Sequence, residues 1–276
     1  MVVTFYLLEM IKKLFKKLLS SAGYSLLSNR NLQTIKEGKY IPDIDFYYLI
    51  NKCFKSNAPV CCFDIGANKG QTSLKLNKYF PKSTIHSFEP ILITYKELEL
   101  NTEDHKSIFP HNIALGDTIG ELEIYRRENS EWNSLNYELN VNAKREGGES
   151  EIIKVDTIDN FLNQNGILKV NFLKSDTEGF EMSVLKGAIK SLENESIEMM
   201  YVEVGFDYLD KQHTHFNEVF SFINNFSYSF CGLFESSYGQ DLKLYYSNAL
   251  FISKQKLAQN TKEKMLSVTF PAKFLP

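Results

Sequence analysis

The alternation of apolar and polar positions predicts one α/β domain in the middle of the chain. From Val60 onward, short apolar runs alternate with segments whose apolar residues recur at helical spacing. This order indicates a mostly parallel sheet with helices on its faces. The predicted strands are 60–64, 84–89, 107–114, 170–176, 197–204, 228–234 and 248–253. The predicted helices are 71–79, 91–101, 157–163, 181–191 and 215–225.

A smaller β structure is predicted between the third and fourth strands. Residues 121–126 and 151–155 alternate apolar and polar side chains, as the two strands of a β-hairpin-like insertion would. The connection between them, 129–150, is polar and contains Trp132. Because long structureless loops are uncommon inside compact domains, we expect this connection to be either a functional lid or disordered.

The first residues of the chain form a separate amphipathic pattern. Within residues 4–20, leucines and isoleucines recur at helical spacing, and four lysines fall on the other side. Two interpretations stay open: a helix that lies on an anionic membrane surface or grips a lipid-linked substrate, and a helix that packs on the main domain. No run reaches the ~18 apolar residues of a membrane span. The lysines follow the apolar stretch, which is the reverse of a secretory signal.

Composition narrows the class of protein. The chain has 276 residues, of which 43% are hydrophobic and 24% charged, and this excludes collagen-like and disordered chains. A net charge of −3 gives no reason to expect a nucleic-acid partner. The four cysteines lack the spacing of a zinc or redox site, so we expect reduced thiols in a cytoplasmic protein. Residues 4–20 add the alternative of peripheral attachment to the inner face of the cell membrane.

The most informative motif follows the first predicted strand. Asp64, Gly66, Asn68 and Gly70 form a D-x-G-x-N-x-G turn that leads into a helix, and the glycines allow a tight turn beneath a ligand. Glu89 ends the second strand, 23 residues beyond Gly66, where a carboxylate can accept hydrogen bonds from both hydroxyls of a ribose.

The spacing of this motif separates two classes of cofactor. Dinucleotide enzymes use G-x-G-x-x-G to bring a helix N-terminus to a pyrophosphate. A carboxylate at the strand end would repel a diphosphate, but it suits a cationic cofactor that carries an amino acid, such as S-adenosylmethionine. Residues 112–117 end the third strand, and an adenine could lie there against Ala114 and Leu115.

A second polar cluster is predicted at the carboxyl ends of the fourth and fifth strands. The strand 170–176 runs into a turn and a helix that carry Asp176, Glu178 and Glu181, and Glu203 ends the neighbouring strand. Open α/β sheets bind ligands at this edge. The carboxylates could act as a general base, hold a divalent metal through Asp176 and Glu203, or orient a sugar. Asp176 is the first candidate for the base.

Simpler interpretations of this cluster also stand. Glu178 and Glu181 could only complement the dipole of the helix that they open. Lys174 is more often a surface lysine than a partner of a site carboxylate. His213 and His215 resemble a metal pair only superficially, because they lie in a polar stretch before a predicted helix.

Taken together, these motifs resemble the FkbM family of S-adenosylmethionine-dependent methyltransferases. The matching stretches are FDIGANKGQTS (63–73), SFEP (87–90), NIALGD (112–117), VDTIDNFL (155–162), LKSDTEGFEMSVLKGA (173–188) and NALFI (248–252). The resemblance implies a Rossmann-like class I methyltransferase fold. It also implies O-methyl transfer, often to a sugar hydroxyl of a glycan or a glycosylated metabolite.

The resemblance also implies roles for single residues. Asp64, Gly66, Asn68 and Gly70 would line the methionine and ribose region, and Glu89 would bind the ribose hydroxyls. Ala114 and Leu115 would border the adenine. The residues near the transferred methyl would be Asp176, Glu178 and Glu181, and Glu203 is the fourth candidate at the catalytic end.

We therefore expect three parts: an N-terminal helix and lead-in (1–57), a methyltransferase domain (58–253) and a C-terminal tail (254–276). The expected activity is O-methylation of a glycan acceptor, either free or lipid-linked, without a nucleic-acid partner. One alternative is a catalytically silent, membrane-associated protein that binds glycans on the same fold. An NAD-dependent oxidoreductase is disfavoured by the glycine spacing.

Overall fold

The computed structural model describes residues 46, 50, 54, 60–127, 130 and 133–262. All of them belong to one compact unit, Asp45–Pro276. The predicted amphipathic helix 4–20 and Trp132 lie outside the described residues. Within the part of the chain that is described, no helix is both long and apolar enough to cross a membrane.

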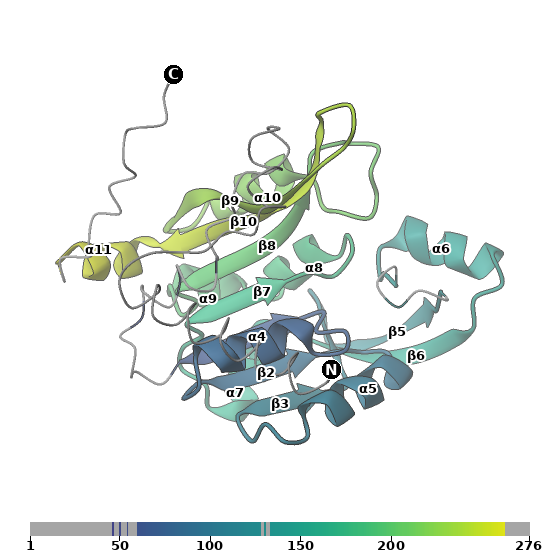
Figure 1. Ribbon diagram of the computed structural model, residues 1–276, viewed down its shortest axis with the longest axis horizontal. Coiled ribbons are helices and arrows are strands. Elements are labelled where there is room, and N and C mark those ends of the chain that lie inside the picture. Colours follow the sequence, from purple (N-terminus) through teal and green to yellow (C-terminus); the bar gives the residue numbers. More distant parts are fainter. Residues whose placement is uncertain are drawn as a thin grey trace, which may run out of the picture. The chain divides into compact units, whose positions relative to one another are not determined.

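A seven-stranded sheet forms the centre of this unit (Figure 1). Its order is β3-β2-β1-β7-β8-β10-β9, and β10 is antiparallel to both of its neighbours, whereas the other pairs are parallel. The strands are β1 (Cys61–Ile65), β2 (Thr84–Phe88), β3 (Ile108–His111), β7 (Phe172–Ser175), β8 (Met199–Gly205), β9 (Tyr228–Tyr238) and β10 (Leu244–Ser253). The predicted class I methyltransferase fold, a mostly parallel seven-stranded sheet, is confirmed.

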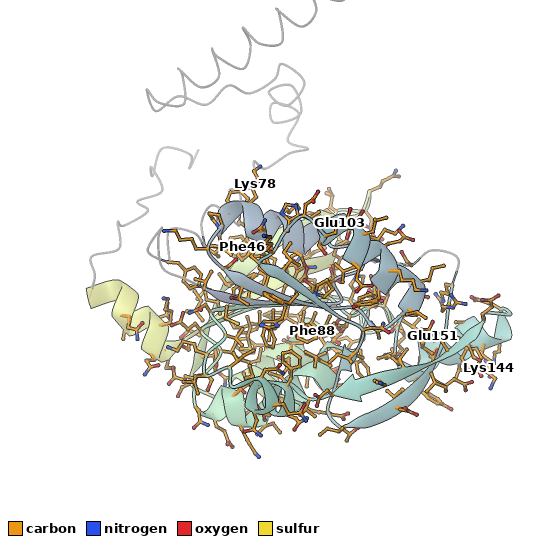
Figure 2. All side chains as sticks on the ribbon, turned by 90° about the horizontal axis from the view of Figure 1, so that it is seen from below. Phe46, Lys78, Phe88, Glu103, Lys144 and Glu151 are labelled. Atoms are coloured by element: carbon orange, nitrogen blue, oxygen red, sulfur yellow. The ribbon has the colours of Figure 1, made fainter. Side chains whose placement is uncertain are left out.

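Helices cover both faces of this sheet. The elements α4 (Gln71–Tyr79) and α5 (Leu92–Thr102) lie on one face, as Figure 2 shows, and α11 (Lys254–Lys262) follows β10. The other face packs against α7 (Ile158–Asn165), α8 (Glu181–Lys186), α9 (Ile189–Glu193) and α10 (Phe216–Ile223). All seven residues of β8 are buried, because a central strand has apolar cover on both sides.

The helix predicted over 181–191 is two helices in the structure. Gly187 lies between α8 and α9, and a Cβ at this position would come within 1.9 Å of the Gly116 carbonyl oxygen. The backbone NH of Asp159 also donates to the Gly187 carbonyl, at 3.0 Å. The close crossing of these segments interrupts the helix, and the glycine makes the crossing sterically feasible.

The predicted insertion exists as a second sheet of order β4-β6-β5. Strand β5 (Gly120–Tyr125) is antiparallel to the central strand β6 (Ser150–Asp156), as the alternation predicted, and β4 (Ala114–Leu115) pairs with the other side of β6 in parallel. The single strand predicted over 107–114 is therefore wrong. The chain leaves the main sheet after His111, because the Asn112 side chain donates to the carbonyl oxygens of Glu89 and Pro90 and turns it away.

The connection 129–150, expected to be either a functional lid or disordered, contains a helix. Helix α6 (Tyr137–Arg145) begins after Asn136, whose side chain accepts hydrogen bonds from the backbone NH groups of Glu138 and Leu139. The helix ends with Lys144 and Arg145, which complement the negative end of its dipole. The asparagine cap was the sequence signal for this helix.

Candidate active site

A cavity of about 330 Å³ lies at the carboxyl ends of β1, β2, β7 and β8. One end is walled by the turn after β1, by Glu89 and by Ala114 and Leu115 of the second sheet. The other end is walled by Lys174, Asp176, Glu178 and Glu203. The two polar clusters that the sequence predicts separately thus share one cavity, which is large enough to hold a small cofactor.

Five of the seven predicted cofactor residues line this cavity. They are Gly66, Asn68, Glu89, Ala114 and Leu115. Ala114 and Leu115 are buried in β4, and Ile91 and Phe180 add further apolar wall, so this end suits a flat apolar ring.

Asp64 and Gly70 lie outside the cavity wall. Asp64 is fully buried in β1, where Oδ2 accepts a hydrogen bond of 2.6 Å from the Ser73 hydroxyl, and burial raises the pKa of its carboxyl. Gly70 precedes α4 with φ +90°, and a Cβ there would come within 2.9 Å of Leu98 Cδ1. Both residues shape the turn that holds the cavity wall, instead of lining it.

Gly66 allows a close crossing of two strand ends. Its φ is +78°, and a Cβ on it would come within 1.8 Å of the Asp176 carbonyl oxygen. The Asp176 backbone NH donates to the carbonyl of Ile65 at 3.0 Å. The glycine therefore brings the predicted cofactor turn directly against the residue predicted as the base.

Glu89 is buried at the wall of the cavity, and its carboxylate is held from one side by the backbone. Oε2 accepts from the Asn68 NH at 3.1 Å, and Oε1 accepts from the Ile91 NH at 3.0 Å. Each carboxylate oxygen can accept more than one hydrogen bond, so both can also accept from a ligand. Burial raises the pKa of Glu89 to about 7, although the two backbone hydrogen bonds oppose the rise.

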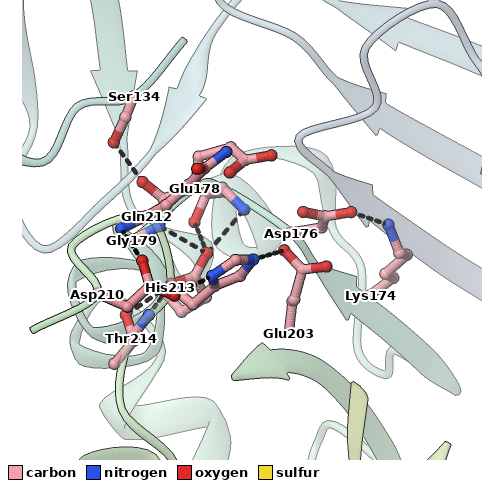
Figure 3. A network of polar contacts seen from close by, with 12 residues as sticks. Ser134, Lys174, Asp176, Glu178, Gly179, Glu203, Asp210, Gln212, His213 and Thr214 are labelled. Carbon is pink, nitrogen blue, oxygen red and sulfur yellow. Dashed lines mark hydrogen bonds and ion pairs between the residues drawn. The ribbon is translucent and has the colours of Figure 1, made fainter. Parts of the chain in front are cut away.

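Asp176 lies beside Lys174 at the other end. Lys174 Nζ is 2.6 Å from Asp176 Oδ2 (Figure 3). The lysine is only 8% exposed, so it is paired with a site carboxylate and is not the surface lysine that is the more common case. Burial by itself would raise the pKa of Asp176, but the Lys174 charge and a hydrogen bond from Glu203 outweigh it and lower the pKa. Asp176 is therefore ionised at neutral pH.

Glu178 and Glu203 occupy the same end in a different state. Burial raises the pKa of Glu178 to about 8, and the neighbouring Asp176 charge adds to the rise. Burial and the same charge raise the pKa of Glu203 well above its usual range. Three carboxyl groups that share one cavity cannot all be ionised cheaply, so the charge is concentrated on Asp176.

Glu181 was expected in this group, but its carboxylate does not line the cavity. Its Oε1 accepts hydrogen bonds from Thr177 and Gly179, and its Oε2 accepts from Thr214. The side chain is 1% exposed. Glu181 therefore holds the loop after β7 against the loop before α10, and it positions Glu178 by fixing the turn around it.

His213 belongs to the site, although sequence reasoning set it aside. Its Nε2 lies 3.7 Å from Glu203 Oε2, and its Nδ1 lies 2.6 Å from Asp210 Oδ2. The loop before α10 folds back over the end of β8, where the Gly205 NH donates to the Thr214 carbonyl. A polar stretch of sequence carries no periodicity that would predict this return.

For the case that a divalent metal is present, the ligands expected from the sequence were Asp176 and Glu203. Within the described residues, the side chains whose ligand atoms converge are Glu178, Glu203 and His213, all within 4.8 Å of one another. Asp176 is instead bound by Lys174.

The family model described as the methyltransferase FkbM domain matches residues 64–230. The chain is similar to "Methyltransferase 1" of Beauveria bassiana (strain ARSEF 2860), with 31% identity over 140 residues. That match covers 45% of this chain and 56% of the fungal protein, so the chain spans little more than half of that relative.

Two solved structures are similar in outline. One is TrmK of M. capricolum, in complex with S-adenosylhomocysteine, with 11% identity, a TM-score of 0.43 and coverage of 76% of this chain and 69% of that chain. The other is fibrillarin of Aeropyrum pernix with bound S-adenosylmethionine, with 10% identity, a TM-score of 0.43 and coverage of 75% and 73%.

Proposed function

The chain belongs to the methyltransferase FkbM domain family, and we propose that it transfers a methyl group from S-adenosylmethionine to a sugar hydroxyl of a glycan or a glycosylated metabolite. The observation that carries the proposal is the single cavity that joins Glu89 to the Lys174–Asp176 pair. The family match confirms the predicted family, the predicted class of enzyme and S-adenosylmethionine as its cofactor. The acceptor is the new part of the proposal.

The residues of the cavity fit this cofactor. S-adenosylmethionine supplies a methyl group on a positively charged sulfur. Glu89 offers two buried carboxylate oxygens to the ribose hydroxyls, and Ala114 and Leu115 offer an apolar wall to the adenine. The ionised Asp176 supports a cationic ligand at the far end.

The acceptor hydroxyl would lie beside Asp176. The carboxylate of Asp176 accepts its hydrogen bond, and the released proton passes to the oxygens of the Asp176–Glu203 pair. Lys174 keeps Asp176 ionised and fixes its orientation through Oδ2. Aligned reactants account for much of the rate in such a site, because positioning alone can be worth ~7–11 kcal/mol.

A sugar suits this end of the cavity better than a flat base does. The wall around Asp176 consists of carboxylates and an ammonium group, which hydrogen-bond to hydroxyl groups, and the imidazole of His213 lies next to Glu203. The aromatic wall residues Phe88 and Phe180 belong with the apolar lining instead.

The test is transfer of an isotope-labelled methyl group by the purified chain to fractions of polysaccharide, nucleotide sugars and RNA. We expect label in a sugar fraction, at a linkage that mass spectrometry assigns to oxygen. Asp176→Asn should lower turnover by about 10²–10⁴-fold, as expected for loss of a general base. Glu218→Gln, an exposed carboxylate on α10, is the control and should retain the rate of the unchanged chain.

Other outcomes of this test would contradict the proposal. If label appears only in the RNA fraction, the acceptor is RNA and not a sugar. Full turnover by Asp176→Asn would remove Asp176 as the base. Binding of glycans without any transfer would favour the catalytically silent alternative.

A further inference from the structure

Three side chains that can bind a metal meet at the acceptor end of the cavity. Glu178 follows β7, Glu203 lies in β8, and His213 comes from the loop before α10 (Figure 3). One ligand atom from each lies within 4.8 Å of the other two. Such a separation allows one cation to touch all three groups.

The imidazole of His213 is oriented as a ligand. Its Nδ1 is 2.6 Å from Asp210 Oδ2, so this nitrogen carries the proton and donates to the carboxylate. The lone pair of Nε2 then faces Glu203. Tyr246 stacks on the ring with centroids 4.7 Å apart and fixes its plane. A carboxylate behind a histidine in this way is the usual support of a metal-binding imidazole.

The charges around these residues leave two carboxylates for a cation. Lys174 is paired with Asp176, and the Glu181 carboxylate is used by backbone and hydroxyl donors. Glu178 Oε2 is buried and has no hydrogen-bond partner among the described residues. Glu178 and Glu203 therefore place two carboxylates close together, and one oxygen of Glu178 has no hydrogen-bond donor among the described residues. Either a proton or a metal ion can stabilise such a pair.

We propose that Glu178, Glu203 and His213 bind a divalent first-row transition-metal ion, with Mn²⁺ as the first candidate. Two carboxylates and one imidazole, without a thiolate, suit a hard to borderline ion. Three protein ligands leave coordination positions open for an acceptor hydroxyl, and the ion would lower the pKa of that hydroxyl. This last role rests on the proposed function, whereas binding of the ion does not.

The experiment measures metal binding without turnover. The chain is freed of metal with a chelator and titrated with Mn²⁺, and free Mn²⁺ is followed by electron paramagnetic resonance. We expect one ion per chain, with His213→Ala and Glu178→Gln weakening the binding by 10-fold or more. Asp210→Asn should weaken it by about 10–100-fold, because it removes the support of the imidazole. Titrations with Zn²⁺ and Mg²⁺ rank the ions.

The control is His215→Asn, two residues away. His215 accepts from the Asn217 NH at the start of α10, and asparagine can cap that helix as well. This variant should bind Mn²⁺ as the unchanged chain does. Thermal unfolding shows whether each variant is folded. If His213→Ala does not fold, Asp210→Asn still tests the site.

Two results would overturn the metal site. One is less than a tenth of an equivalent of any of the three ions at millimolar concentration, which indicates a shared proton instead. The other is unchanged affinity in both His213→Ala and Asp210→Asn. Metal binding without methylation of any sugar would contradict only the proposed acceptor. Full methylation by the chelated chain would contradict only the proposed role of the ion in the transfer, and not its binding.

Discussion

Glu89 is the residue at which local geometry most directly sets ligand affinity. Two backbone NH groups hold its carboxylate, and burial at 7% exposure raises its pKa to about 7. Ribose hydroxyls donate hydrogen bonds, so the ionised form is the one that binds. The affinity for the cofactor should therefore depend on pH in the physiological range.

We expect the affinity for S-adenosylmethionine to rise by about tenfold from pH 6 to pH 8, as the ionised fraction of a group with a pKa of about 7 rises. Glu89→Gln should bind about 10–100-fold more weakly at pH 8, because it loses charged hydrogen bonds worth ~1.5–3 kcal/mol. Its affinity should also be nearly flat across this range. Calorimetric titration measures both effects. Equal affinity of the unchanged chain and Glu89→Gln at pH 8 would contradict the role of Glu89 in binding the ribose hydroxyls.

The candidate site was predictable where a motif fixes the backbone. Gly66 and Glu89 follow strands at a characteristic spacing, so their places in the fold follow from the order of the strands. His213 was not predictable, because only the return of a polar loop over β8 brings it to Glu203. The sequence also does not distinguish Glu178, which lines the cavity, from Glu181, which accepts a hydrogen bond from Thr214.

At the scale of elements, the segment before α6 contacts the turn that carries Glu178 and Gly179. The Ser134 hydroxyl donates to the carbonyl of Glu178, and the Asn136 side chain contacts the carbonyl of Gly179 at 3.4 Å. Asn136 also caps α6. The position of Glu178 therefore depends on a helix for which the sequence analysis predicted only a loop.

Asn136→Ala should lower the free energy of unfolding by about 1 kcal/mol, the usual cost of a lost helix cap. It should also raise the KM for the acceptor several-fold with little change in kcat, because the turn that carries Glu178 loses a contact. Thr157→Ala is the matched control, since Thr157 caps α7 through the Asn160 NH at 3.1 Å. It should cost similar stability and leave KM unchanged; an equal rise in KM would contradict this role of Asn136.

At the scale of the whole molecule, the sheet was predicted well and the insertion only in part. Buried central strands such as β8 are recognisable as apolar runs, and alternation was enough to pair β5 with β6. The place at which the chain changes sheets was missed, because the side chain of Asn112 determines it and no periodic pattern does. The net charge of −3 likewise gives no hint that several acidic groups share one cavity.

Those acidic groups determine how the stability of the cofactor-free, chelated molecule depends on pH. Burial raises the pKa of Glu89 to about 7 and of Glu178 to about 8, whereas unfolding returns both to near 4.5. From pH 6.5 to 8 the folded chain therefore binds more protons than the unfolded chain, and its free energy of unfolding should fall by about 2–3 kcal/mol. His86, whose pKa burial lowers to about 4, opposes this trend mainly below pH 6.5. Urea unfolding at both pH values measures the fall, which should be smaller in Glu178→Gln; stability that rises with pH would contradict the burial of these carboxyls.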